Sequence, residues 1–212
     1  MLRAIQPEIL DTLPPDDPAA RKSRRELRFI NHVMGNFRWF ARTLAAVVRP
    51  GERVIEIGAG AGDLSDHLSR LGLAVDGLDV CPAPAGWPKG KRWHQCDLRD
   101  FDGFDSYDVV LANLVLHHFS DDELAAVGER LRRHARAIVA SEPERRLKWR
   151  LLCTVWSPLL GPVTRHDARV SIEAGFRGAE MARALGLEKG SWEIACPAGA
   201  TAMNRLVAVR RA

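Results

Sequence analysis

Three glycines at alternate positions, flanked by acidic residues, are the part of this sequence best suited to ligand chemistry. Gly58, Gly60 and Gly62 follow an apolar run that contains Glu56. Glycine lets the backbone approach a flat ligand closely and permits positive φ. The next residue is Asp63, whose carboxylate would oppose a phosphate at a helix start, so the dinucleotide fingerprint G-x-G-x-x-G is not met. The pattern favours a positively charged nucleoside that lacks phosphate.

Two further acidic positions end later apolar runs. Asp79 lies about twenty positions after Gly58, where an acidic residue binds the ribose hydroxyls in Rossmann-type sites. Asp97, followed by Leu98, places an acceptor where an adenine amino group would lie. S-adenosylmethionine is a nucleoside of this kind, since it carries a sulfonium, an amino group and a ribose diol but no phosphate. Glu56 can offer negative charge near its amino end. The four scattered cysteines and the histidines lack metal-site spacing, so no metal is expected.

Histidines follow the fourth apolar run and recur downstream. After Asn113 the chain reads Leu-Val-Leu-His117-His118-Phe, and His166 lies in a Thr-Arg-His-Asp segment. Imidazole titrates near neutral pH, so His117 or His166 can take a proton from a phenol or enol. Of the adjacent pair, His117 is favoured. The alternative for that pair is a structural role, in which both histidines are hydrogen-bonded at a helix start.

An alternation of short β-rich runs with helical patterns begins at Gly51 and indicates βαβ units in a mainly parallel sheet. The last two runs flank a turn at 197–199 and predict an antiparallel hairpin at one sheet edge. Ligands of open α/β sheets lie at the carboxyl ends of the strands, where the residues above are expected. The predicted strands are 53–57, 74–79, 92–96, 108–113, 136–141, 192–195 and 205–209.

The predicted organisation is one domain with two additions. Residues 1–19 are expected to form an irregular arm, because prolines and carboxylates interrupt any regular structure there. Residues 20–212 form the domain, with a helical cap over 20–48 and an inserted roof over the substrate site at about 144–175. Apolar residues at helical spacing predict a cap helix with Leu27, Ile30, Met34 and Phe37, a second one from Trp39 to Val48, and a later helix with Leu64, Leu68 and Leu71 on one face.

The ordered segments V-I-E-I-G-A-G-A-G-D, L-D-V, C-D-L and A-N-L-V-L-H-H-F resemble the motifs of class I S-adenosylmethionine-dependent methyltransferases. The resemblance covers roughly residues 51–141. It implies an α/β, Rossmann-like, doubly wound sheet of seven strands, mainly parallel with an antiparallel C-terminal strand. It also implies that the three glycines line the methionine portion, that Asp79 binds the ribose and Asp97 the adenine, and that S-adenosylhomocysteine is the product.

The acceptor is expected to be a small, lipophilic or aromatic molecule methylated on oxygen or activated carbon. Asn113 is not followed by Pro-Pro-aromatic, and neither a Pro-Cys nucleophile nor a glutamate pair is present, which argues against several nucleic-acid and protein methyltransferases. The runs N-x-V-M-G-N-F-R-W and T-R-H-D are similar to small bacterial methyltransferases of type III polyketide pathways. That likeness implies a phenol, pyrone or quinone acceptor, Arg38 on the cofactor carboxylate and His166 opposite the methyl group.

Charge and hydropathy leave alternatives open. The net charge is +4, but the basic runs are typical of solvated helix faces and lack interleaved aromatic residues, so no specific nucleic acid is expected. An RNA or protein methyltransferase and a non-catalytic S-adenosylmethionine-binding partner remain the alternatives. The Trp-bearing stretch 147–160 predicts a roof for a lipophilic substrate, a peripheral membrane contact or a core helix. Without a leader or a long apolar segment, a cytoplasmic location is expected.

Overall fold

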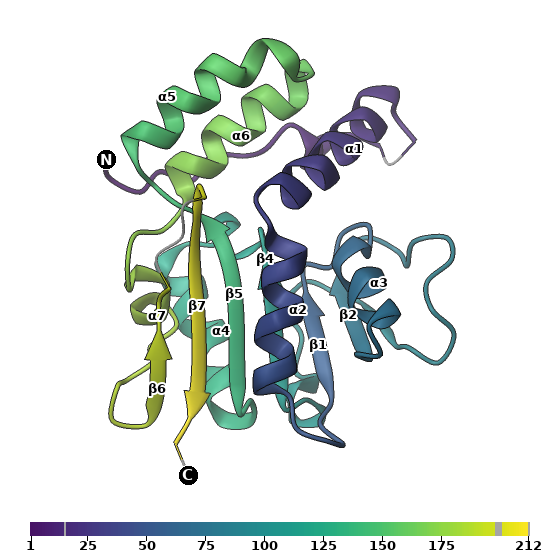
Figure 1. The fold of residues 1–212 in the computed structure, drawn as a ribbon, viewed down its shortest axis with the longest axis vertical. Coiled ribbons are helices and arrows are strands. Elements are labelled where there is room, and N and C mark those ends of the chain that lie inside the picture. The colour runs from purple at the N-terminus through teal and green to yellow at the C-terminus, as the bar shows by residue number, and fades with distance from the viewer. Residues whose placement is uncertain (15, 198–200, 212) are drawn as a thin grey trace.

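The computed structural model describes residues 1–14, 16–197 and 201–211 and contains a seven-stranded sheet in the order β3-β2-β1-β4-β5-β7-β6 (Figure 1). The first five strands are parallel, and β7 runs antiparallel to both β5 and β6. The predicted fold class is therefore confirmed. The strands are β1 (Val54–Ile57), β2 (Val75–Asp79), β3 (Trp93–Gln95), β4 (Val109–Asn113), β5 (Ala137–Pro143), β6 (Trp192–Ala195) and β7 (Met203–Arg210).

Helices cover both faces of the sheet, because the central strands are apolar on both sides. Val110 of β4 packs in one core with α4 and α7, whereas Leu111 packs in another with α2 and α3. The α-helices are α1 (Pro18–Val33), α2 (Asn36–Val47), α3 (Asp63–Arg70), α4 (Asp121–His134), α5 (Leu147–Trp156), α6 (Pro162–Ala174) and α7 (Glu180–Ala184). The 3-10 turns are η1 (Leu10–Thr12), η2 (Gly103–Ser106), η3 (Leu116–His118) and η4 (Ser157–Leu159).

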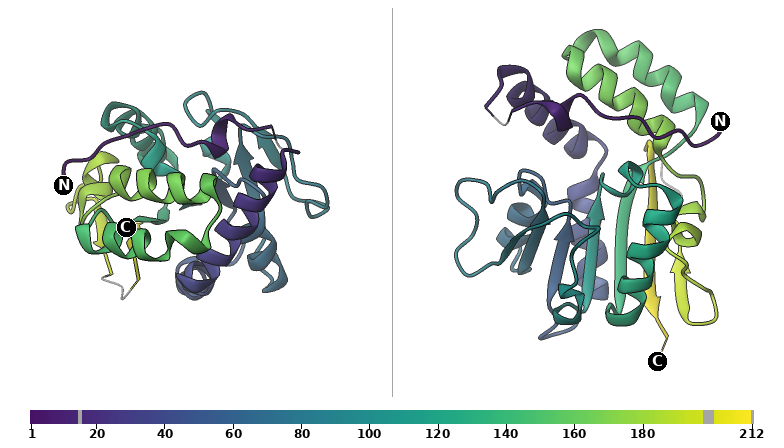
Figure 2. Two further views of the ribbon diagram at one scale, coloured as in Figure 1. Left: turned by 90° about the horizontal axis from the view of Figure 1, so that it is seen from above. Right: turned by 180° about the vertical axis from the view of Figure 1, so that it is seen from behind.

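The helices α5 and α6 form a layer above the carboxyl ends of the strands, and α1 lies beside them (Figure 1). The N-terminal segment crosses the same end of the molecule next to α6 (Figure 2). Gly161 and Thr164 at the start of α6 both donate to the Glu26 carboxylate of α1, which ties the two helices together. The end of the sheet that is expected to bind ligands is thus covered by the N-terminal segment and α1 together with α5 and α6.

Three helix predictions need correction. The cap helix ends at Val33, because Gly35 adopts a left-handed φ of 67° and Phe37 belongs to α2. Leu71 does not share the buried face of Leu64 and Leu68, since α3 stops at Arg70 and leaves Leu71 58% exposed. The core-helix alternative for 147–160 is wrong as well, because α5 contains no buried residue.

The C-terminal hairpin is confirmed. Strand β6 pairs antiparallel with β7, with Ile194 opposite Ala208. Strand β7 extends beyond the predicted 205–209, because its first residue, Met203, pairs with Pro143 at the end of β5. Most of the turn predicted at 197–199 lies outside the described residues.

Candidate functional site

The glycine loop between β1 and α3 adopts the conformation that its sequence requires. Gly58, Gly60 and Gly62 have φ values of 65°, 53° and 75°, a region that L side chains rarely adopt. A Cβ on Gly58 would lie 2.3 Å from the Val115 side chain, whereas a Cβ on Gly60 would meet nothing within 4 Å. Gly58 therefore serves packing against the segment after β4, and Gly60 leaves open space beside the backbone.

Asp79 closes the next strand and reaches the same loop. Its Oδ2 accepts a hydrogen bond from the Gly60 amide at 2.8 Å, and its Oδ1 accepts one from the Cys81 amide at 2.9 Å. Because β1 and β2 are parallel neighbours, their carboxyl ends lie at the same end of the sheet. The structure thus brings together the glycine loop and the acidic residue predicted to bind a ribose.

Glu56 lies beneath the loop and is only 2% exposed. Its Oε2 accepts a hydrogen bond of 2.5 Å from the Ser65 hydroxyl of α3. Burial raises the pKa of Glu56 to about 8, although the Ser65 hydrogen bond acts in the opposite direction. The carboxyl is mostly neutral at pH 7, so it supplies the expected negative charge only when a cation nearby compensates the burial.

Asp97 lies after β3 and is held by Arg99. Their side chains form an ion pair of 2.7 Å, and the Arg99 amide also donates to Asp97 at 2.8 Å. The hydrogen bonds from Arg99 hold the pKa of Asp97 below its usual range. The adjoining Leu98 is buried at the margin of the core. The carboxylate predicted to meet an adenine is therefore charged and already oriented.

Four polar side chains meet at the end of β4. The Asn36 side chain donates to Asn31 Oδ1 at 2.9 Å, and Asn113 donates to the same oxygen at 3.2 Å. Ser141 Oγ of β5 donates to Asn36 Oδ1 at 3.1 Å. The left-handed residue between α1 and α2 turns the chain so that both asparagines of the cap reach Asn113. Arg38, two residues after Asn36, is exposed on α2, and its proposed role stays a prediction.

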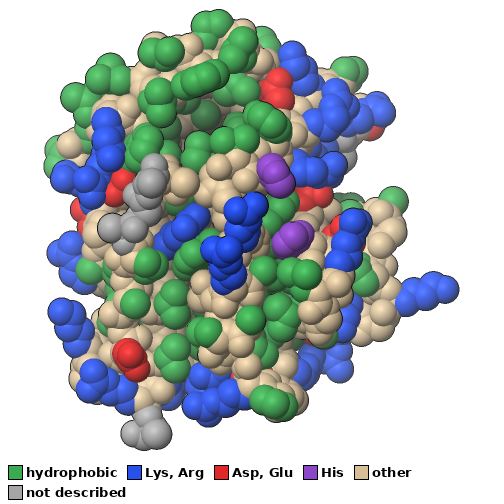
Figure 3. Space-filling view, in the orientation of Figure 1, with side chains coloured by type: hydrophobic (Ala, Val, Ile, Leu, Met, Phe, Trp, Pro, Cys, Tyr) green, Lys and Arg blue, Asp and Glu red, His purple; other side chains and the backbone are tan. Residues whose placement is uncertain are grey.

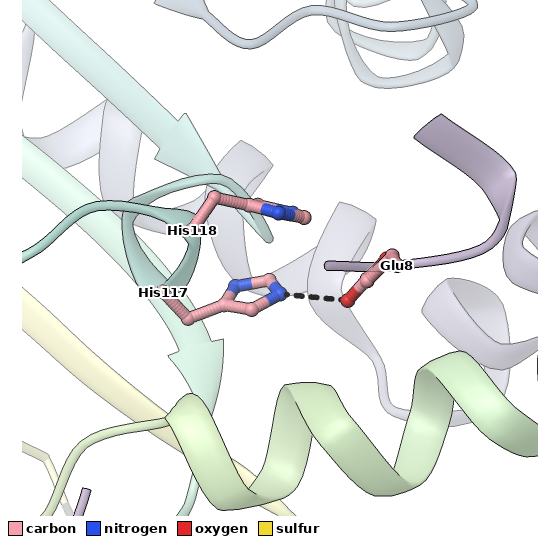
Figure 4. A group of neighbouring side chains, drawn as sticks. All are labelled: Glu8, His117 and His118. Carbon is pink, nitrogen blue, oxygen red and sulfur yellow. Dashed lines mark hydrogen bonds and ion pairs between the residues drawn. The ribbon is translucent and has the colours of Figure 1, made fainter. Parts of the chain in front are cut away.

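His117 is buried between two carboxylates, those of Glu142 and Glu8, and Figure 4 shows its contact with Glu8. Its Nδ1 lies 2.7 Å from Glu142 Oε2 of β5, and its Nε2 lies 3.3 Å from Glu8 Oε1 of the arm. Burial lowers the pKa of His117, but the hydrogen bonds and charges of Glu142 and Glu8 outweigh it and raise the pKa to about 9. His117 is thus an imidazolium at neutral pH while Glu8 stays in contact.

Glu142 fixes the position of η3 as well as the His117 ring. Its Oε1 accepts hydrogen bonds from the amides of Val115 and Leu116, at 3.0 and 2.9 Å. The carboxylate is completely buried, so these donors replace the water that a charged group requires. Because Nδ1 of His117 donates to Glu142, Nε2 is the nitrogen left to face the site.

The arm is pinned on the other side by α6. Asp167 accepts hydrogen bonds from the amides of Ile9 and Leu10, at 2.8 and 3.0 Å. The neighbouring His166 is partly exposed and places Nδ1 3.1 Å from Asp167 Oδ1. His118 lies 3.5 Å from Asp11 of the same arm. His117 contacts the arm directly, and His166 lies beside the aspartate that holds it.

Several of these residues were not predicted from the sequence. Glu142 had a signal, because it ends the fifth strand, where site residues of parallel sheets gather. Glu8 had none, since it contacts a histidine more than a hundred positions away through an irregular arm. Asn36 belongs to the run N-x-V-M-G-N-F-R-W, but its contact with Asn113 depends on the helix break at Gly35.

Comparison with known proteins agrees with this geometry. A family profile described as "Methyltransferase domain" matches residues 55–137. The ubiquinone biosynthesis O-methyltransferase of Bradyrhizobium diazoefficiens is 34% identical over 113 residues, which are 50% of this chain and 38% of that protein. An uncharacterized methyltransferase of Bacillus subtilis, YrrT, is 28% identical over 115 residues, 49% of this chain and 54% of that protein. The chain thus spans about half or less of these relatives.

Solved structures share the fold over nearly the whole chain. The plantazolicin methyltransferase BpumL in complex with SAH gives a TM-score of 0.66 at 16% identity, covering 92% of both chains. The magnesium protoporphyrin IX methyltransferase of Synechocystis PCC 6803 with bound SAH gives 0.58 at 20% identity, covering 95% of this chain and 91% of that one. Residues 55–137 therefore resemble a methyltransferase domain, and the chain shares its fold with solved methyltransferase structures.

Proposed function

We propose that this protein transfers a methyl group from S-adenosylmethionine to oxygen or activated carbon of a small, lipophilic or aromatic acceptor. The observation that carries the proposal is the meeting of the glycine loop with Asp79 at the carboxyl ends of β1 and β2. Gly60 leaves room beside the backbone, Asp79 offers two acceptor oxygens for a ribose diol, and Glu56 lies below the loop. These features fit a cationic nucleoside that lacks phosphate.

S-adenosylmethionine supplies a methyl carbon already activated by sulfonium, so the chain mainly has to align the acceptor and exclude water. We assign proton removal to His117. Glu142 holds the Nδ1 side of the ring, which leaves Nε2 facing Glu8 of the arm. This is the arrangement of a carboxylate-oriented general base. His166, on the α6 side, is the alternative base.

The arm controls the charge of this base. While Glu8 contacts Nε2, that nitrogen is occupied and the ring is protonated. Moving Glu8 away frees Nε2 and removes one of the two carboxylates that raise the His117 pKa. An acceptor hydroxyl that takes the place of Glu8 would then meet an imidazole with a lower pKa. We propose that acceptor binding and displacement of residues near Glu8 occur together.

The lipophilic character of the acceptor is supported by the layer above the site. Helix α6 directs the apolar side chains of Val163 and Val170 into the protein. A relative is named as a ubiquinone biosynthesis O-methyltransferase, and a structural neighbour is named as a magnesium protoporphyrin IX methyltransferase. Formation of S-adenosylhomocysteine with a panel of phenols, pyrones and quinols tests the proposal directly, and turnover of RNA or protein alone would overturn it.

Asp79→Ala is expected to weaken S-adenosylmethionine binding by about 10- to 150-fold, since a charged hydrogen-bond acceptor contributes about 1.5–3 kcal/mol. Isothermal titration calorimetry measures the change. Asp79→Asn is a second variant, because the amide oxygen still accepts from the Gly60 amide while the negative charge is lost. Asp102→Ala, at a largely exposed carboxylate, is the matched control and should bind normally. Wild-type affinity in both Asp79 variants would exclude this residue from the ribose site.

Cofactor binding is expected to release a proton from Glu56 near pH 7. The carboxyl has a pKa of about 8 because it is buried, and an ammonium group nearby would stabilise the charged form. The binding enthalpy should therefore depend on the ionisation enthalpy of the buffer, and affinity should rise with pH up to about 8. Glu56→Gln should remove that dependence. Equal enthalpies in phosphate and Tris for the wild type would show that Glu56 does not exchange a proton on binding.

A further inference from the structure

Large apolar side chains are exposed along α5 and η4. In α5 and η4, Leu151, Val155, Trp156 and Leu159 are 57%, 72%, 57% and 74% exposed, and Leu147 and Leu152 add to the same helix. None of the ten residues of α5 is buried. Figure 3 shows hydrophobic side chains gathered over the top of the molecule, where Figure 1 places α5 and α6. We call this set, residues 147–159, the roof surface.

The exposed apolar side chains of α5 follow helical spacing. Leu147, Leu151 and Val155 recur at four-residue steps, and Leu152 and Trp156 repeat that step one position later. Trp149 and Cys153 are only partly exposed. Helix α6 packs below and carries the buried residues of this hairpin. The apolar stripe of α5 therefore points away from the protein core.

The chain segment that contains the roof surface has an excess of positive charge. Between Glu144 and Asp167 the chain contains five basic residues and no acidic one. Arg145, Arg146 and Arg150 pair with Glu180, Glu144 and Glu173. Lys148 and Arg165 make no ion pair among the described residues, although Lys148 lies 4.4 Å from the Trp149 ring and Arg165 donates to backbone carbonyls. Uncompensated positive charge thus accompanies the apolar stripe.

We infer that the roof surface binds the face of an anionic lipid bilayer, with α5 lying in the interface. Leucine and tryptophan side chains enter the boundary between headgroups and acyl chains, while nearby lysine and arginine meet lipid phosphates. A second copy of the chain is a poorer partner, because pairing two such surfaces would bring like charges together. The contact is peripheral, since no helix among the described residues is long and apolar enough to cross a bilayer.

Vesicle binding tests this inference. The full chain is mixed with sedimentable vesicles of phosphatidylcholine alone or with 30% phosphatidylglycerol (about one lipid in three, enough to set a negative surface potential). Wild-type protein is expected to bind the anionic vesicles at least tenfold more tightly than the neutral ones, and added salt should weaken binding. Val155→Glu combined with Leu151→Glu should reduce binding to anionic vesicles by at least tenfold.

A matched control distinguishes binding through the roof surface from nonspecific adsorption to vesicles. Leu71→Glu changes an exposed leucine at the end of α3, outside the roof surface, and should leave vesicle binding unchanged. Thermal unfolding and S-adenosylmethionine binding, measured on all variants, should match the wild type, so a loss of vesicle binding is not a loss of fold. Equal binding by the roof variant and the wild type would overturn the inference. So would a stable dimer, without lipid, that the roof variant dissociates.

Discussion

Replacing His117 by Ala is expected to lower kcat by about 10²- to 10⁴-fold while leaving the affinity for S-adenosylmethionine nearly unchanged, the usual effect of removing a general base. His117→Ala and His166→Ala are compared in single-turnover and steady-state assays on an accepted phenol or quinol. His32→Ala, at an exposed position near the end of α1, is the control. The variant with the larger loss of kcat identifies the base.

The pH dependence distinguishes a base from a structural histidine. The base must be neutral, so kcat/KM should rise with pH through the pKa of His117, which is about 9 with Glu8 in contact. Glu8→Gln removes one of the two carboxylates that raise this pKa, and the midpoint of the rise should move to lower pH. If His117→Ala and His166→Ala both keep wild-type turnover and the wild-type pH profile, neither histidine is the base, and alignment alone accounts for catalysis.

Glu142→Ala is expected to lower the free energy of unfolding by about 3–5 kcal/mol, the range for breaking a buried ion pair. The variant leaves a buried imidazolium with one partner and leaves the amides of Val115 and Leu116 without their acceptor. Urea unfolding at pH 7 measures the loss. Glu193→Ala, at an exposed position on β6, should change the same quantity by less than about 0.5 kcal/mol.

The same pair makes stability depend on pH. The folded pKa of His117 is raised to about 9 from its ordinary value of 6.5, so its contribution is complete below pH 6.5 and is lost as pH rises to about 9. Wild-type stability should fall over that window through this group, and Glu142→Ala should flatten the fall. Identical slopes in the two proteins would show that His117 and Glu142 are not coupled in the folded state.

Local patterns were enough to predict the sheet. Each parallel strand was predicted to within about two residues, because apolar runs between Gly-rich or Pro-rich segments are a short-range signal. The glycine loop and Asp79 were predicted together for the same reason, since both close neighbouring strands. The single-helix prediction through Gly35 was wrong, because apolar spacing alone does not show where a glycine adopts a left-handed conformation.

Contacts that depend on the path of the chain were not predictable. The arm was expected to be irregular, and only the three-dimensional fold brings Glu8 to His117 and the Ile9 amide to Asp167. The exposure of α5 was equally hidden, because Leu and Trp at helical spacing are typical of core, substrate-facing and interfacial helices alike. The long stretch without acidic residues could be read from the sequence. It could be interpreted only once the apolar side chains of α5 were known to face outward.

The position of β7 between β5 and β6 limits the order in which the strands can pair while the chain is being synthesised. As the chain leaves the ribosome, β5 can pair with β4 at once, but its other edge has no partner until Met203–Arg210 has been made. Strand β6 emerges before β7 and cannot join the sheet without it. During translation the nascent domain therefore presents an open, apolar strand edge, which is a target for chaperones and for pairing with other nascent chains.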